Sequence, residues 1–389
     1  MNRTNDGIGG AYGAQGSYGV HGAPLGANLL ALRSHNTALV LDLLRTAGAE
    51  GISRLELAER TGLTPQAVSK ITARLRADGL AAEAGRRAST GGKPRTVLRL
   101  VPEAGHAVGV HLDRDEMRAV LVDLDGAVVD LRRAPLDLGA GEEAVLARVA
   151  GVVEALRVPG ADGTGRGGRA PLGVGVALPG PLDHEKGVLH RVTGFPEWDG
   201  FPLRDALARR LGVPVVVDKD TNAAALGLAV GGEGGSFAYL HLGTGLGAGL
   251  VMGGSVYRGA RTGAGEFGHQ VVQLDGRPCT CGARGCVEVL CLDAVARGDV
   301  AEAARVLGAG AANLVGLLDI DLVLLGGRTV AAAPEAFVRG VGAVLAARAR
   351  REGGGDGVVP VRVAPGGVQG VAEGAAQLVL APLFGRGDA

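Results

Sequence analysis

Beyond about Ala104, strand-length apolar runs alternate with helical stretches. The runs "AVGVHL", "MRAVLVDLDG", "LGVGVAL" and "VPVVVD" each have the length and residue types of a buried β-strand. This alternation predicts an α/β fold, because helices that follow buried strands cover the faces of the sheet. A chain of 389 residues also exceeds one ordinary hydrophobic core, so we expect two or three domains.

The amino terminus and the hydropathy of the chain bear on its compartment. The first residues, "MNRTNDGIGG", lack the basic-then-apolar pattern of a secretion signal. No uncharged apolar run is long enough to cross a bilayer, since "NLVGLLDIDLVLLGG" is interrupted by two aspartates. We therefore expect a cytoplasmic protein with no membrane partner. Residues 1–28 are rich in glycine and predict a disordered tail, and "VPGADGTGRGGRAP" (158–171) predicts a flexible loop.

Two short helices joined by a tight turn are predicted between residues 53 and 79. Ser53 and Glu56 form a Ser-x-x-Glu capping box, and Thr64 followed by Pro65 marks a second helix start. Two helices so closely joined match a helix-turn-helix, whose second helix can enter a DNA major groove. The solvent face of that second helix carries Gln66, Ser69, Lys70, Ala73 and Arg74.

The next stretch, "LAAEAGRRASTGGKPRTVLRLV", predicts a strand, a glycine-rich turn and a second strand, the form of a wing that lies along phosphates. Residues 53–100 contain ten Lys or Arg and four Asp or Glu, a net charge of +6 in a chain whose formal net charge is zero. This asymmetry favours double-stranded DNA as the partner over the alternative, a small helical packing module with a solvated charged face. The basic residues around the tip of the wing are Arg86, Arg87, Lys93 and Arg95.

Three of the four cysteines, Cys279, Cys281 and Cys286, fall within eight residues. The glycines between them let the loop curl, and three neighbouring thiolates need one more donor to complete a tetrahedral Zn²⁺ site. His269 and Cys291 both lie near enough in sequence, so spacing leaves that choice open. A disulfide is disfavoured in a reducing compartment, and a redox pair would lack the usual Cys-x-x-Cys. Unligated buried thiols are the remaining alternative.

The segment "GAGEFGHQVVQLDGRPCTCGARGCVE" resembles the paired signatures of the ROK family (repressors, open reading frames and sugar kinases). The resemblance extends to "GVALPGPLD", to "VPVVVDKDTNAAALG", to the glycine-rich "LHLGTGLGAGLVMGGSVYRGA" and to "DIDLVLLGG". "LRSHNTALVLDLL" and the helix-turn-helix resemble the family's repressor head, so the match covers about residues 29–385. It is carried by several long motifs in order.

The resemblance implies both the fold and the domain boundaries. A winged helix-turn-helix over about 29–104 would be followed by a two-lobed actin-like or ribonuclease H-like α/β domain over about 105–389. The small lobe would hold about 105–218 with the C-terminal segment, and the large lobe about 219–371. A homodimer or homotetramer is also implied, in keeping with two-fold symmetric operators.

Carried over position by position, the resemblance implies a sugar site supported by structural Zn²⁺. The metal would hold the loop that presents two glutamates, and carboxylates suit sugars because they accept hydroxyl protons in short, charge-assisted bonds. Two solvated surface glutamates are the alternative. The implied zinc ligands are His269, Cys279, Cys281 and Cys286, which leaves Cys291 outside the site. The implied sugar-binding residues are Lys219, Asp220, Glu266, His269 and Glu288.

Lys219 departs from the family pattern, because family kinases usually have Asn just before the catalytic aspartate, here Asp220. An ammonium carries charge and only donates hydrogen bonds, so it would favour a phosphorylated or acidic sugar. The alternative is that Lys219 pairs with Asp218 or Asp220.

The turn after the first strand of the α/β domain departs further. Family kinases carry Asp-x-Gly-Gly-Thr-Lys there, whereas this chain reads "HLDRDE", with His111 in place of the aspartate. Asp113, Asp115 and Glu116 would place three carboxylates where a triphosphate should lie, with Arg114 offsetting part of the charge. Like charges about 4 Å apart repel by roughly 4 kcal/mol at an effective dielectric near 20. We therefore expect no kinase activity.

These features predict a sequence-specific transcriptional regulator, a repressor of sugar metabolism genes. A sugar or phosphosugar effector would bind between the lobes, and Asp220 would be a vestigial catalytic base. The alternatives are an ATP-dependent sugar kinase with a fused DNA-binding head, a regulator that senses a protein partner, and a structural zinc protein that does not bind DNA.

Overall fold

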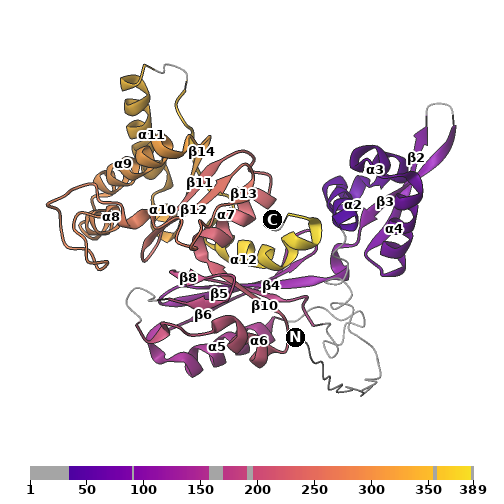
Figure 1. Cartoon of the computed structure of the whole chain (residues 1–389), viewed down its shortest axis with the longest axis horizontal. Coiled ribbons are helices and arrows are strands. Elements are labelled where there is room, and N and C mark those ends of the chain that lie inside the picture. The colour runs from indigo at the N-terminus through magenta and orange to yellow at the C-terminus, as the bar shows by residue number, and fades with distance from the viewer. Residues whose placement is uncertain (1–34, 90–91, 157–169, 191–195, 354–356, 387–389) are drawn as a thin grey trace, which may run out of the picture.

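The computed structural model describes residues 35–89, 92–156, 170–190, 196–353 and 357–386. Side chains are described within these ranges except at residues 88–89 and 92–94. The tail predicted over 1–28 and most of the loop predicted over 158–171 therefore lie outside the described residues. The described chain forms a small head beside a larger body that contains two five-stranded sheets (Figure 1).

The head is a winged helix-turn-helix. It contains α2 (His35–Ala47), α3 (Arg54–Thr61), α4 (Pro65–Ala77), β1 (Ile52–Ser53), β2 (Ala81–Ser89) and β3 (Gly92–Leu100). The strands form an antiparallel sheet in the order β1-β3-β2, and β2 with β3 makes the predicted wing. Val68 and Leu75 of α4 are fully buried against α2 and the sheet, as amphipathic spacing predicts.

Local hydrogen bonds define where the head helices begin. Ser53 N donates to Glu56 Oε2 at 2.8 Å and Glu56 N donates to Ser53 Oγ at 3.3 Å, so the predicted capping box is confirmed. Ala67 N donates to Thr64 Oγ1 at 3.2 Å, and Pro65 opens α4. These bonds satisfy backbone amides that a helix start otherwise leaves without partners.

The first body sheet contains β4 (His106–Leu112), β5 (Glu116–Asp123), β6 (Val128–Pro135), β7 (Val174–Leu178) and β10 (Val215–Lys219). Its order is β10-β7-β4-β5-β6, with β10, β7 and β4 parallel and β4, β5 and β6 an antiparallel meander. Helices α5 (Glu142–Ala155) and α6 (Leu203–Leu211) cover one face, and α12 (Gly370–Leu380) covers the other (Figure 1). A short ribbon, β8 (Leu182–Asp183) with β9 (Val188–Leu189), follows β7.

The second body sheet contains β11 (Phe237–Leu242), β12 (Leu246–Met252), β13 (Ser255–Val256), β14 (Leu322–Gly326) and β15 (Val361–Val363), in the order β13-β12-β11-β14-β15. Helices α8 (Val287–Ala296), α9 (Val300–Leu318) and α11 (Pro334–Arg351) share a core with one face of this sheet, and α10 (Arg328–Ala332) follows β14. Helix α7 (Asp220–Val230) packs on the other face and against α12. Single turns of 3-10 helix lie at Gly48–Glu50, Pro102–Ala104, Leu138–Ala140, Pro196–Trp198, Phe267–His269 (η5), Gly367–Gln369 and Ala381–Phe384 (η7).

Glycines let α7 and α12 approach closely between the two sheets. A Cβ on Gly374 would lie 2.0 Å from Ala223 O, and one on Gly227 would lie 2.9 Å from Gly374 Cα. A side chain at either position would therefore push the helices apart. Because α12 also packs on β4 and β7, this helix pair connects the two sheets.

Helix α9 is long and apolar enough to cross a membrane, judged by length and composition alone. It packs against α8 and α11, and Ala303, Leu307 and Ala311 on its inner face are fully buried. The apolar face of α9 is therefore explained by its burial in the core of the body.

The head and the body share one hydrophobic cluster. Leu44 of α2 packs in the same cluster as Leu380 of α12 and Phe384 of η7. The guanidinium of Arg45 lies 4.5 Å from the centroid of the Phe384 ring, and Arg386 pairs with Asp42 at 2.9 Å. These contacts run from α2 through α12 to both body sheets.

Candidate functional site

A polar cavity of about 80 Å³ lies between the two body sheets. Its walls come from the carboxyl ends of β7 and β10, the β4–β5 turn, the β11–β12 turn, the η5 segment and the start of α8. Ligands of open α/β sheets bind at this end of parallel strands. The structure brings all five residues of the predicted sugar site to this cavity: Lys219, Asp220, Glu266, His269 and Glu288.

Lys219 is only 4% exposed, and its ammonium is already paired. Its Nζ donates to Glu266 Oε1 at 3.1 Å and to the carbonyl oxygen of Ala264 at 2.5 Å. The predicted pairing with Asp218 or Asp220 is therefore wrong. Successive side chains leave a strand on opposite faces, so Lys219 at the end of β10 points away from Asp218 and toward Glu266.

Asp218 belongs to a separate buried network. Its Oδ2 accepts hydrogen bonds from Arg258 at 2.7 and 2.8 Å, and its Oδ1 accepts one from Asn222 Nδ2 at 2.9 Å. Charged side chains are rarely this buried without such partners. The pair ties the end of β10 to the segment after β13, and sequence inspection did not anticipate it.

Asp220 and Glu288 present carboxylates into the cavity from the first turns of α7 and α8. Asp220 Oδ1 accepts from Thr221 N at 2.7 Å, and Glu288 Oε2 accepts from Leu246 N at 2.8 Å. Each carboxylate keeps further acceptor capacity, because an ionised carboxylate has about four lone-pair sites. Carboxylates with free lone pairs around a small cavity suit a ligand rich in hydroxyl donors.

His269 and three cysteines form a compact donor cluster beside the cavity. One donor atom from each of His269, Cys279, Cys281 and Cys286 lies within 4.8 Å of the others. The distance is 3.7 Å both from Cys279 Sγ to His269 Nδ1 and from Cys281 Sγ to Cys286 Sγ. Sulfurs about 2.3 Å from a tetrahedral Zn²⁺ would lie about 3.8 Å apart, so the spacing fits that ion.

Cys291 does not belong to the donor cluster. It is fully buried in the core between α8 and α9, and its thiol donates to the carbonyl oxygen of Ala303 at 3.5 Å. The fourth donor in the cluster, which spacing alone left open, is therefore His269. This residue also lines the cavity, so the cluster and the cavity share one side chain.

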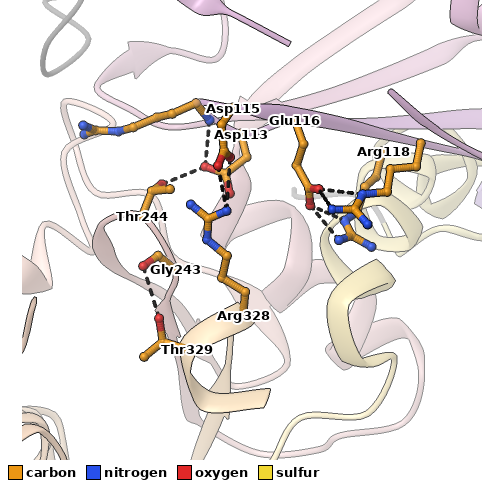
Figure 2. A network of polar contacts seen from close by, with 10 residues as sticks. Asp113, Asp115, Glu116, Arg118, Gly243, Thr244, Arg328 and Thr329 are labelled. Carbon is orange, nitrogen blue, oxygen red and sulfur yellow. Dashed lines mark hydrogen bonds and ion pairs between the residues drawn. The ribbon is translucent and has the colours of Figure 1, made fainter. Parts of the chain in front are cut away.

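The β4–β5 turn, which reads "HLDRDE" with the end of β4, is occupied by contacts between the two sheets (Figure 2). Asp113, which is 8% exposed, accepts from Thr244 Oγ1 at 2.7 Å and from Arg114 N at 2.8 Å. Burial opposes ionisation of Asp113, but these hydrogen bonds hold its pKa below the ordinary value. Asp115 pairs with Arg328 at 2.9 Å, and this second contact again joins the β4–β5 turn to the second sheet.

Glu116 does not join this group, and the prediction of three carboxylates in the phosphate position is wrong on this point. It begins β5 and pairs with Arg118 and Arg133, away from Asp113 (Figure 2). The register of the sheet explains this orientation. Glu116 lies two residues before Arg118 on β5, so their side chains share a face, and Arg118 lies directly opposite Arg133 on β6. The cation paired with Asp115 is Arg328, which sequence inspection did not single out. Only the glycines of "LLGG" before it marked that segment in the sequence.

In the head, the predicted DNA-facing residues of α4 are exposed on one face. Seven of the eight predicted DNA contacts have described side chains, and two of these seven have partners within the head. Arg74 donates to Thr37 Oγ1 at 2.8 Å, and Arg87 donates to Glu56 at 3.0 Å and to Gly51 O at 3.1 Å. The side chain of Lys93 lies outside the described part of the wing. The exposed residues of the predicted set are Gln66, Ser69, Lys70, Arg74, Arg86, Arg87 and Arg95.

Comparison with known proteins agrees with both parts of the chain. The profile of the ROK family matches residues 107–295, and a winged helix-turn-helix DNA-binding profile matches residues 40–81. The xylose repressor of Caldicellulosiruptor bescii is 31% identical over 240 residues, which cover 61% of this chain and 59% of the repressor. The chain thus spans about three fifths of the length of that relative.

Two solved structures extend the comparison to the fold. The ROK hexokinase of Thermus thermophilus is 30% identical with a TM-score of 0.54, and the match covers 70% of this chain and 96% of the hexokinase. A ROK family transcriptional regulator, a homolog of the E. coli MLC protein, has a TM-score of 0.71 at 20% identity and covers 91% of this chain and 98% of its own. At 20% identity, the likeness to this regulator shows a shared fold, and its coverage of 91% of the chain includes the head.

Proposed function

Because the chain belongs to the ROK family, we propose that it is a sequence-specific DNA-binding transcriptional regulator, a repressor of sugar metabolism genes that responds to a sugar or sugar derivative. One observation carries this proposal: the same chain joins a basic winged helix-turn-helix to a cavity lined with carboxylates. We assign DNA binding to about residues 29–104 and effector binding to about 105–389, in the cytoplasm and without a membrane partner.

The effector would lie in the cavity between the sheets, with its hydroxyls donating to Asp220, Glu266 and Glu288 and contacting His269. Lys219 would act mainly by orienting Glu266, because its ammonium already has two acceptors. The Lys219–Glu266 pair favours a neutral sugar over a phosphorylated one, since the cation is matched by a carboxylate within the site.

The donor cluster would hold a structural Zn²⁺ through His269, Cys279, Cys281 and Cys286, a closed set of four N and S ligands. Its role would be to fix the segment between η5 and α8, so that Glu266 and Glu288 hold their positions. The donor chemistry and the 3.7 Å spacing support this proposal.

We further propose that the chain does not transfer phosphate from ATP. Two features support this: Asp113 and Asp115 lie at the family's phosphate turn, and Thr244 and Arg328 engage them directly. Side chains thus occupy space that a triphosphate needs, and Asp220 remains as a carboxylate that serves sugar binding. The alternative is an active sugar kinase with a DNA-binding head.

Control of DNA binding would pass from the cavity to the head through α12. This helix contacts β4 and α7 in the body, and the η7 turn that follows it packs on α2. A sugar that binds one arrangement of the lobes more tightly would shift the population of head positions by that difference in affinity. In a homodimer or homotetramer, this would change the spacing between two recognition helices.

A gel-shift assay tests this function. The full chain is mixed with duplex DNA from upstream of its own gene, with and without neutral pentoses, neutral hexoses, their N-acetylated forms and their phosphates. We expect binding that one sugar class releases, and Asp220→Asn should bind DNA but not respond. Failure to bind the duplex would contradict the regulator, and binding that every sugar leaves unchanged would favour control by a protein partner.

A phosphotransfer assay with ATP and the same sugars tests the loss of kinase activity. We expect no sugar phosphate above the level of Asp220→Asn. Turnover near ordinary kinase rates, about 1–100 s⁻¹, would restore the kinase alternative.

A further inference from the structure

A histidine that sequence inspection did not single out lies at the interlobe cavity, the polar cavity between the two body sheets. His241 is near the end of β11, is half-buried and lines the cavity together with Asp220 and Thr244. The centroid of its ring lies 6.2 Å from that of His111, which is on β4 of the first sheet. The cavity therefore contains an imidazole from the second sheet that faces the first.

Tyr239 fixes which nitrogen of His241 carries the proton. Its hydroxyl lies 2.9 Å from His241 Nδ1, and the two side chains share a face because they are two positions apart on β11. Burial, together with the charge of Asp220, raises the pKa of Tyr239, so the hydroxyl keeps its proton. Nδ1 is the acceptor that this buried hydroxyl reaches among the described residues, so the hydroxyl donates to it. The neutral imidazole then carries its own proton on Nε2.

The Nε2–H group of His241 is left for a ligand. Nε2 of His241 makes no hydrogen bond with a described residue and remains accessible, whereas Nε2 of His111 is buried without a partner among them. A Cβ on Gly243 would lie 3.0 Å from His241 Nε2, so the glycine keeps this edge of the ring clear. His241 therefore offers the cavity an uncharged donor of fixed orientation.

This donor complements the carboxylates of the cavity. Asp220, Glu266 and Glu288 only accept hydrogen bonds when they are ionised, whereas a sugar hydroxyl can donate one bond and accept another. Asp220 lies close enough to Tyr239 for its charge to act on that hydroxyl, so it lies near the Tyr239–His241 pair. A sugar hydroxyl bound at this place can therefore donate to Asp220 and accept from His241.

We propose that His241, oriented by Tyr239, determines the specificity of the effector site by donating to a sugar hydroxyl that Asp220 also binds. This inference rests on the proposed function and deepens it, because it names the group that the effector must carry. A deoxy sugar has neither the donor nor the acceptor at that position. A methyl ether keeps the acceptor but cannot donate to Asp220, and a phosphate would place its charge against that carboxylate.

Titration calorimetry of the full chain tests the proposal, with D-xylose, D-glucose and N-acetyl-D-glucosamine as a neutral pentose, a neutral hexose and an N-acetylated hexose. For a sugar that binds, His241→Leu should weaken binding about tenfold or more, because the hydroxyl loses its donor. His241→Gln, whose side-chain amide can present an N–H near the position of Nε2, should recover most of this loss. His35→Leu, which replaces an exposed histidine at the start of α2, is the matched control and should leave sugar binding unchanged.

Monodeoxy analogues of the same sugar separate a direct contact from a structural role. One analogue should bind wild type about tenfold or more weakly than the parent sugar, and His241→Leu should discriminate between the two by a smaller factor. Unchanged discrimination for every analogue, or equal sugar affinity of wild type and a folded His241→Leu, would overturn this inference alone. If wild type binds no sugar of the panel, the proposed function fails with it. Thermal unfolding and operator binding check that each variant is folded.

NMR of the histidine ring nitrogens tests the part assigned to Tyr239. The His241 signals, identified by their absence in His241→Gln, should show a proton on Nε2 in wild type. Tyr239→Phe should give a mixture of both tautomers and weaken sugar binding by a smaller factor than His241→Leu. A wild-type His241 with its proton on Nδ1 would contradict the proposal, because Nε2 could then no longer donate.

Discussion

Asp218 and Lys219 are neighbours in sequence, yet their charges serve different parts of the body. Asp218 pairs with Arg258 inside the protein, whereas Lys219 reaches Glu266 at the cavity. The two pairs also differ in burial, since Glu266 is partly exposed and the Asp218–Arg258 pair is not. When one partner of a buried ion pair is removed, water cannot reach and solvate the charge that remains. Loss of Arg258 should therefore lower stability more than loss of Lys219.

Arg258→Met should lower the free energy of unfolding by about 3 kcal/mol or more, because Asp218 would remain buried without its cation. The matched control is Arg328→Met, which breaks an exposed ion pair and should cost at most about 1 kcal/mol. Thermal unfolding of the three proteins measures the difference. Similar unfolding temperatures for both variants would show that Asp218 does not depend on Arg258.

Glu56 makes the stability of the head depend on pH. Hydrogen bonds from the backbone and the side chain of Ser53, with a smaller effect of Arg87, lower the pKa of Glu56 below its usual 4.5. A carboxyl with a lowered folded pKa stabilises the fold above the unfolded pKa, and this contribution is lost as pH falls through the folded value. The protection factor for amide exchange in α3, the intrinsic rate divided by the observed rate, should therefore fall below about pH 4.5 in wild type. It should change less steeply in Glu56→Gln, and parallel profiles would contradict the prediction.

At the scale of elements, α4 and the β2–β3 wing supply the charge of the head, and not all of that charge is available. Arg87 pairs with Glu56 and holds the wing to α3, so its role is partly structural. Arg86 and Lys70 are exposed and make no ion pair with a described residue. These two are therefore the better candidates for phosphate or base contacts.

Lys70→Ala and Arg86→Ala should each weaken operator binding and reduce the slope of log affinity against log salt by about one. Arg351→Ala, which removes an exposed charge from the end of α11 in the body, is the matched control and should change neither quantity. Fluorescence anisotropy at several salt concentrations provides the measurement. An unchanged slope in both head variants would place DNA elsewhere.

We predict that the segment between η5 and α8 depends on a metal held by the donor cluster. Removing the metal with a chelator should weaken effector binding about tenfold or more while leaving operator binding intact, because the cavity glutamates lose their support and the head does not. Cys281→Ser should reproduce the loss, and Cys291→Ala, a thiol outside the cluster, should not. Metal analysis and effector calorimetry on the same samples test this, and full effector affinity in a metal-free sample would contradict it.

At the scale of the whole molecule, two contacts between the β4–β5 turn and the second sheet hold the two body sheets together. The Asp113–Thr244 bond involves a buried carboxylate, whereas the Asp115–Arg328 pair is exposed at both ends. Losing a donor to a buried carboxylate costs about 1–3 kcal/mol, and losing an exposed ion pair costs about 0–1 kcal/mol. The hydroxyl of Thr244 should therefore contribute more to the closed arrangement than the more visible salt bridge.

Thr244→Val should increase amide exchange in residues 113–116 and 244–247 by about tenfold, the equivalent of about 1.4 kcal/mol. Arg328→Ala should increase it by less, and added salt should remove its effect but not that of Thr244→Val. Hydrogen–deuterium exchange of the effector-free chain measures both. If Arg328→Ala increased amide exchange more than Thr244→Val at moderate salt, the ion pair and not the Thr244 hydroxyl would contribute more to the closed arrangement.

What the sequence determined by itself is local. The capping box at Ser53, the helix start at Thr64 and the wing follow from residues a few positions apart, because each depends on hydrogen bonds within one turn or one hairpin. The apolar runs also predicted four strands of the first body sheet, namely β4, β5, β7 and β10. The spacing of the cysteines predicted a donor cluster, but not whether its fourth member would be His269 or Cys291.

The tertiary structure alone decided which distant side chains meet. Asp115 and Arg328 are 213 positions apart, and Lys219 and Glu266 are 47 apart, so their pairing depends on how the sheets pack. Strand register turned the side chain of Glu116 away from those of Asp113 and Asp115 and toward Arg118 and Arg133. The cavity of about 600 Å³ between the head and the body exists only because α2 of the head packs on η7, the turn that follows α12. Each of these contacts joins elements that are far apart in sequence. The residue pattern within one helix or strand does not specify which distant element it will meet, so these contacts can be seen only in the folded chain.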